Sequence, residues 1–178
     1  MKARNLEGGQ ESGFSLIELL IVIVIIGILS TLTVIFVNAS RRAANGASAI
    51  QSMRVLSQCQ AGYSAGVGNQ NYADSQELFN EDFIENGLAR ACIPTPTGTS
   101  KGGSPALGRD PKSGFVFNFN RTLATSTDSS KFDITGTPAV TSGSARTGDR
   151  TFFVDQTSVI RTSSLPTDLA DSSSKPID

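Results

Sequence analysis

Apolar residues are concentrated in one stretch near the start of the chain. Residues 14–37 read FSLIELLIVIVIIGILSTLTVIFV, in which 18 of 24 residues are hydrophobic. As an α-helix this stretch would measure about 36 Å, enough to cross a hydrocarbon core of about 30 Å. A secretory signal peptide fits less well, because its apolar core is only about 7 to 15 residues long. The pattern therefore predicts a membrane-spanning helix.

Beyond position 37 the helical pattern continues but becomes amphipathic. Residues 38–63 contain no proline, and apolar side chains recur there at spacings of three or four. Such spacing places them on one face of a helix, so 38–63 is predicted to be a spine helix with one buried stripe. The stripe consists of Ile50, Met53, Leu56, Cys59 and Tyr63, and the polar positions opposite it are Arg54, Ser57, Gln58 and Gln60.

A period of two follows later in the chain and predicts a small sheet. Residues 114–120 read GFVFNFN, so that three phenylalanines share one face of an extended strand. That aromatic face is expected to pack against the stripe of the spine helix. Further antiparallel strands are predicted at 131–135, 151–155 and 158–162.

The remaining segments complete the expected fold. Asp74 and Glu77 form a capping-box pattern that opens a short helix over 75–86. The chain from 163 to 178 is polar and without periodicity, as in a mobile tail. We therefore expect an α+β protein: a long N-terminal helix packed on a small antiparallel sheet with long loops, in a head formed by 64–162.

Composition excludes several classes of function. The chain has no histidine, which removes the commonest general base and metal ligand. Its formal net charge of −1 gives no basic field for a phosphate backbone, so nucleic-acid binding is not expected. No metal site, cofactor site or catalytic residue is predicted, and the chain is not expected to be an enzyme.

Glu18 is the unusual residue of the apolar stretch. An acidic side chain costs about 3 kcal/mol at mid-membrane and normally has a partner there, yet residues 14–37 contain no lysine or arginine. If the chain is cut after Gly13, the new α-amine of Phe14 supplies a cation one helical turn away or on a neighbouring chain. The alternative is an anchor helix in which the carboxylate is incidental.

These residues resemble a known motif. Gly13-Phe14-Ser15-Leu16-Ile17-Glu18-Leu19-Leu20, followed by the Ile/Val run, is similar to the N-terminus of type IV pilins and type II secretion pseudopilins. The resemblance implies that 1–13 is a leader removed by a prepilin peptidase, that Phe14 becomes the N-methylated first residue, and that Glu18 acts in assembly. Many members carry a helix-bending proline near the end of the apolar run, where this chain has Ile35.

The resemblance also implies a location and a set of partners. The leader would lie in the cytoplasm and the head outside the cytoplasmic membrane, although Lys2 and Arg4 before the span and Arg41 and Arg42 after it do not decide the orientation. Membrane lipid would surround the helix before assembly on a pilus or secretion platform. Copies of the chain would then form a helical filament, as a surface pilus or a periplasmic pseudopilus.

Two cysteines, Cys59 and Cys92, lie 33 positions apart. In an oxidising compartment they are expected to form a disulfide, which would stabilise the head by about 3 to 4 kcal/mol. Two separately buried thiols are the alternative.

Two functional hypotheses remain. The first is a structural filament subunit; major pilin, minor pilin and secretion pseudopilin share its features. The second is a membrane-anchored binding module, such as an adhesin or DNA-uptake component, which would be marked by an exposed basic or aromatic patch. The cations of the head are scattered in sequence, at Lys101, Arg109, Lys112 and Lys131. Any ligand, glycosylation and weak calcium binding at Asn69, Asn71 and Asp74 are left open.

Overall fold

The computed structural model describes residues 13–95, 100, 101 and 109–177, the side chains of 32–35 excepted. The chain divides into two compact units, Met1–Asn38 and Ala39–Asp178. The predicted leader lies outside the described residues except for Gly13.

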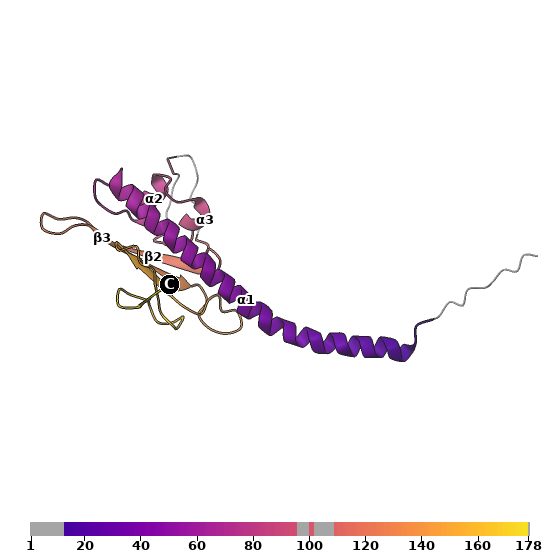
Figure 1. The fold of residues 1–178 in the computed structure, drawn as a ribbon. Helices are drawn as coiled ribbons and strands as arrows, with labels where there is room; N and C mark the ends of the chain where they lie inside the picture. The colour runs from indigo at the N-terminus through magenta and orange to yellow at the C-terminus, as the bar shows by residue number, and fades with distance from the viewer. Residues whose placement is uncertain (1–12, 96–99, 102–108, 178) are drawn as a thin grey trace, which may run out of the picture. The chain divides into compact units, whose positions relative to one another are not determined.

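One continuous helix, α1 (Leu16–Ala65), contains both helical segments that the sequence predicts (Figure 1). Its residues up to Asn38 belong to the first unit and the remainder belong to the second. The helix contains no proline, so every residue along it can donate its backbone N–H. The predicted long N-terminal helix is confirmed.

The second unit contains a six-stranded sheet whose spatial order follows the chain. The strand β1 pairs with β2 in parallel, and every later pair is antiparallel. The α+β class is therefore confirmed, but the sheet is mixed rather than wholly antiparallel. The strands are β1 (Cys92–Ile93), β2 (Phe115–Thr122), β3 (Lys131–Pro138), β4 (Phe152–Asp155), β5 (Arg161–Thr162) and β6 (Lys175–Pro176).

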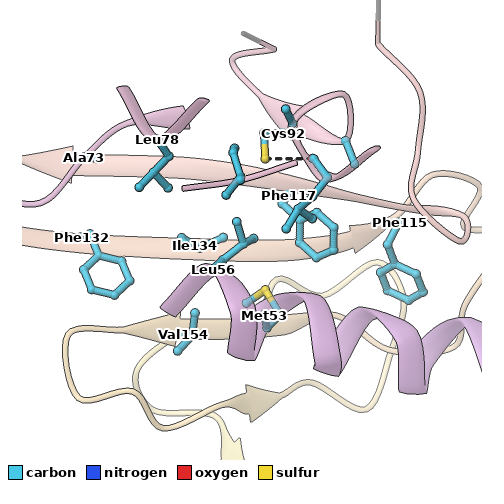
Figure 2. Close-up of a cluster of buried hydrophobic side chains, with 14 of the residues drawn as sticks. Met53, Leu56, Ala73, Leu78, Cys92, Phe115, Phe117, Phe132, Ile134 and Val154 are labelled. Carbon is cyan, nitrogen blue, oxygen red and sulfur yellow. Dashed lines mark hydrogen bonds between the residues drawn. The ribbon is translucent and has the colours of Figure 1, made fainter. Parts of the chain in front are cut away.

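The aromatic face of β2 lies in the core, as its period of two predicts. Phe115 and Phe117 are fully buried, and Phe117 pairs with Gly136 of β3. A Cβ on Gly136 would lie 3.4 Å from the sulfur of Met53 and 3.3 Å from the ring of Phe117. The absence of a side chain at Gly136 thus lets α1 approach the sheet closely, and Figure 2 shows Met53 and Leu56 on the side of α1 that faces the strands.

The buried stripe of α1 differs from the predicted one at polar positions. Gln60 is fully buried and Ser57 nearly so, although both were expected on the exposed face. The Gln60 amide donates to Ala73 C=O at 2.7 Å and accepts from Ala73 N–H at 2.8 Å. Ser57 Oγ donates to Ser158 Oγ at 3.0 Å. These polar groups are buried because each has a hydrogen-bond partner.

The predicted helix over 75–86 is divided into α2 (Ser75–Asn80) and α3 (Asn86–Ala89). The capping box of Asp74 and Glu77 is present in full. The first helix ends early because Asp82 adopts a left-handed φ of 59°. Its N–H bonds to Phe79 C=O, and Phe83 N–H bonds to Leu78 C=O, the pattern of a Schellman end in which glycine is the usual residue.

The polar segment after residue 162, expected to be a mobile tail, is attached to the sheet at several points. Its strand β6 pairs with β5, and Ala170 is buried. The buried hydroxyl of Thr151 accepts from Ala170 N–H at 2.9 Å and donates to Asp168 C=O. Ile177 N–H bonds to Ile160 C=O at 2.9 Å. The sequence gives little sign of this order, because it rests on backbone contacts rather than on apolar periodicity.

Candidate functional site

The residues that resemble a processing motif lie at the start of α1. Gly13, Phe14 and Ser15 precede the first helical turn. Ser15 C=O accepts the N–H groups of Glu18 and Leu19 at 3.0 and 3.2 Å, which places Ser15 at the N-cap. The bond between Gly13 and Phe14 therefore belongs to a short non-helical segment.

Glu18 occupies the third helical position and reaches back to this cap. Its Oε2 accepts the backbone N–H of Ser15 at 3.4 Å. This is the half of a capping box in which the acidic side chain accepts from the cap. A carboxylate is also favoured in the first turn by the partial positive charge of the helix N-terminus. Local structure alone thus holds the Glu18 carboxylate beside the backbone N–H of Ser15.

The segment around the Gly13–Phe14 bond is open. The side chain of Phe14 is 84% exposed, and a Cβ placed on Gly13 would meet no described atom within 4 Å. Packing within the described chain therefore does not explain why position 13 is a glycine. Binding of this segment in the narrow site of a second protein, such as a peptidase, would explain it.

The apolar half of α1 is exposed on all sides. From Leu16 to Leu29 the large apolar side chains lie at the surface of the unit. Among the described residues, α1 is the one helix long and apolar enough to cross a membrane. The hydroxyls of Ser30 and Thr31 donate to the carbonyls of Ile26 and Ile28 at 2.7 and 2.8 Å, so neither would enter lipid without a partner. Such a surface needs cover from lipid or from other helices.

Comparison with known proteins identifies this region. Residues 9–34 match the family described as the prokaryotic N-terminal methylation motif. The chain therefore carries the motif that is characteristic of type IV pilins and pseudopilins, and the resemblance noted in the sequence is confirmed. The motif indicates a structural protein rather than an enzyme, and with the apolar helix it fits membrane anchoring before assembly.

No curated protein and no solved structure matches the chain.

Both cysteines are free thiols in the structure, so the predicted disulfide is not confirmed. Cys59 Sγ donates to Phe83 C=O at 2.9 Å, and Cys92 Sγ donates to Leu88 C=O at 3.3 Å. Burial raises the pKa of Cys92 to about 12 and also raises the pKa of Cys59. Each thiol has its own hydrogen-bond acceptor, as in the alternative of two separate thiols, but Cys92 is buried whereas Cys59 is only half-buried.

Two of the three oxygen-rich residues considered for weak calcium binding, Asn71 and Asp74, have other partners. Asp74 caps α2 and pairs with Arg121 at 3.3 Å. Asn71 Oδ1 accepts the backbone N–H of Ala124 at 3.0 Å. Both side chains thus tie the loop before α2 to the sheet.

The sequence pattern did not predict one cluster of charged side chains. Arg42 and Arg146 both pair with Asp149, at 3.1 and 2.6 Å. Arg42 and Asp149 are 107 positions apart in the chain, so no local pattern could have joined them. The cluster contains none of the scattered cations named in the sequence, of which Lys101 and Lys112 pair with Glu81 and Glu85 instead. The cap contact of Ser15, in contrast, was available in the sequence as Ser-x-x-Glu.

Proposed function

We propose that the chain is the precursor of a structural subunit of a type IV pilus or a pseudopilus. Residues 1–13 are removed as a leader, Phe14 becomes the N-methylated first residue, and the mature chains assemble into a helical filament. The observation that carries this proposal is the methylation motif at residues 9–34. The exposed segment at Gly13 and Phe14 and the uncovered apolar helix support it.

Cleavage by a prepilin peptidase would change the charge at the start of α1. Hydrolysis of the Gly13–Phe14 bond converts the amide nitrogen of Phe14 into an amine that is protonated at neutral pH. Methylation leaves that nitrogen basic, so the cation remains. The amine is then four residues before Glu18, in a segment otherwise rich in leucine and isoleucine.

Assembly would replace lipid around α1 with the helices of neighbouring subunits. Packing of the leucine and isoleucine side chains supplies most of the cohesion in such a bundle. Pairing of Glu18 with the Phe14 amine of an adjacent subunit sets the register, because only one axial offset brings the two groups together. The platform that inserts subunits is a further partner implied by the motif.

The location follows from the same proposal. The subunit is anchored in the cytoplasmic membrane before assembly, with its head outside the cytoplasm. A pilus carries it to the cell surface, whereas a pseudopilus keeps it in the periplasm. Filaments recovered by shearing intact cells distinguish the two, since shearing releases only surface structures.

Replacement of Glu18 tests the proposal. Glu18→Ala removes one member of a buried ion pair and leaves the amine uncompensated, a loss of about 3 to 5 kcal/mol per subunit. Membrane insertion is expected to be unchanged or improved, because the helix becomes more apolar. Filament content is measured in sheared material, and the subunit pool is measured in membranes. We expect filaments to disappear while the membrane pool is retained.

Two further variants sharpen the result. Glu85→Ala removes a carboxylate from the surface of the head and serves as the matched control, with filament number unchanged. Glu18→Gln keeps hydrogen bonding without the charge and should give fewer filaments. Filaments of normal number and length in Glu18→Ala would refute the pairing. N-terminal mass spectrometry provides an independent check, since a mature chain that begins at Met1 would refute processing.

The same experiment addresses the second candidate, an anchored minor pilin, adhesin or DNA-uptake module. Such a module would keep its amount, location and ligand binding when Glu18 is replaced. The cluster of Arg42, Arg146 and Asp149 is the observation that favours a binding role, since it gathers positive charge that the sequence shows only as separate residues.

A further inference from the structure

The C-terminal segment encloses a polar pocket within the second unit. The pocket has a volume of about 830 Å³, which lies in the range of about 300 to 1,000 Å³ that small-molecule sites occupy. Arg150, just before β4, lines it together with Thr162 of β5 and Lys175 of β6. The remaining wall is the segment 163–174, which connects β5 to β6.

Hydrogen bonds to backbone groups hold this wall in place. The hydroxyl of Thr151, a fully buried residue, accepts from Ala170 N–H at 2.9 Å and donates to Asp168 C=O. Arg161 Nη1 donates to Ser174 C=O at 3.1 Å. A ligand that enters the pocket would therefore not have to order the wall first, which lowers the free-energy cost of binding.

Burial of apolar surface does not explain why 163–174 is ordered. Ordering a segment costs conformational entropy, which apolar burial normally offsets. Here Leu165 and Leu169 are 52% and 68% exposed. The segment thus contributes little to the core, and what it builds is the wall of a pocket.

The lining is polar but carries no excess of either charge. Serine and threonine hydroxyls make up much of it, and its two cations, Arg150 and Lys175, are matched by two carboxylates, Asp168 and Asp171. A simple anion or cation would therefore meet as much repulsion as attraction. The chemistry of the lining favours a neutral ligand that both donates and accepts hydrogen bonds.

Several lining groups are free to bind such a ligand. The exposed side chains of Arg150, Asp168 and Lys175 have no hydrogen-bond or ion-pair partner among the described residues. Leu169 adds an exposed apolar surface beside them. The pocket thus offers donors, an acceptor and one apolar face. A sugar has the matching groups, because each of its hydroxyls donates and accepts and its C–H faces are apolar.

We propose that this pocket binds a neutral oligosaccharide. The Asp168 carboxylate accepts from sugar hydroxyls, Arg150 and Lys175 donate to sugar oxygens, and Leu169 packs against a C–H face of a ring. Because the contacting groups are exposed and only one of them is apolar, we expect a dissociation constant of about 1 mM. This binding goes beyond the proposed filament function and does not depend on it.

The test is saturation-transfer NMR on the full chain in dodecylphosphocholine micelles, a detergent that contains no sugar. The neutral probes are maltotriose, cellotriose and chitotriose. Trigalacturonic acid serves as the acidic probe and acetyl-trialanine amide as the peptide probe. We expect saturation transfer to at least one neutral trisaccharide and none to the acidic or peptide probe.

A matched pair of variants locates the binding. Asp168→Ala removes the carboxylate but keeps the backbone C=O that bonds to Thr151, so the wall is retained. It should weaken binding of the responding trisaccharide about tenfold, the effect of losing one hydrogen bond to a charged group. Asp128→Ala removes an exposed carboxylate that does not line the pocket, and it should leave binding unchanged.

Thr151 is a positioning residue in this proposal, since its hydroxyl holds the wall. Thr151→Val removes the hydroxyl and should abolish binding together with the amide-exchange protection of Ala170. Thr151→Ser keeps the hydroxyl and should retain both.

Contrary results would overturn the inference. These are no transfer to any of the three neutral trisaccharides, equal or stronger transfer to the acidic or peptide probe, and equal affinity in wild type and Asp168→Ala. Binding that persists in Thr151→Val would likewise show that the ordered wall is not the site.

Discussion

The buried amide of Gln60 allows a quantitative test of how the head is held on α1. Its side chain is fully buried and bonds to both backbone groups of Ala73, at 2.7 and 2.8 Å. Ala73 lies in the loop before α2, so these two bonds fix that loop against the helix. Gln60→Leu would leave a buried N–H and a buried C=O without this partner.

The expected cost follows from those two groups. Each unsatisfied buried group costs about 1 to 3 kcal/mol, and the added apolar surface of leucine recovers a part of the total. We expect the free energy of unfolding to fall by about 3 kcal/mol, a large fraction of the 5 to 15 kcal/mol typical of a domain. For a unit of this size the midpoint temperature should fall by about 6 to 12 °C.

The assay is thermal unfolding of the full chain in detergent micelles, followed by near-ultraviolet circular dichroism. Gln58→Leu is the matched control, because Gln58 lies exposed on the same helix, and its effect should stay within about 0.5 kcal/mol. Gln60→Glu retains size and acceptors but buries a charge. That variant should be least stable at neutral pH and recover as acid protonates the new carboxyl. Equal shifts for the leucine variants at 58 and 60 would refute the reasoning.

Two further predictions concern titratable groups of the head. Burial, with the opposed carboxylate of Asp155 across the strands, raises the pKa of Asp133 above its usual value, so its ionised form destabilises the fold. Asp133→Asn should therefore raise the free energy of unfolding at pH 7 by about 0.5 kcal/mol. Melting curves should show this gain shrinking as the pH falls and the wild-type carboxyl of Asp133 becomes protonated. Burial raises the pKa of Cys92 to about 12 and also raises the pKa of Cys59, so both thiols should react slowly with iodoacetamide at pH 8. Cys92, which is buried where Cys59 is only half-buried, should react more slowly, and the two rates should be equal in denaturant. A chain that reacts in denaturant only after reduction would instead contain the disulfide.

Local periodicity explains what the sequence could predict. The apolar run, the alternating phenylalanines and the capping box at Asp74 each encode their element over a few residues, and the structure contains all of them. The methylation motif is equally local. In each case the signal and the structure it forms occupy the same short segment.

The features that the sequence did not predict depend on distant partners. Gln60 is buried because Ala73 supplies both hydrogen bonds, whereas a pattern of polar and apolar letters assigns an amide to the surface. The strand β1 (Cys92–Ile93) has only two residues, and its parallel partner β2 begins much further along the chain, at Phe115. Arg42 and Asp149 meet across 107 positions. Asp82 ends a helix in the conformation for which glycine is the usual signal.

The contact between Glu18 and Ser15 changes how assembly should be reasoned about. If the Glu18 carboxylate had no partner in the membrane, pairing with a neighbouring amine would recover the full free energy that its desolvation costs. Here Oε2 already accepts the N–H of Ser15, and that N–H remains after cleavage on its N-terminal side. The free energy that pairing contributes to assembly is therefore the difference between the carboxylate bonded to Ser15 alone and the carboxylate also bonded to the neighbour's amine. Because a carboxylate has about four acceptor sites, Glu18 can keep the cap and bind the Phe14 amine of a neighbour at the same time. The cap then serves to orient the carboxylate before the neighbour arrives.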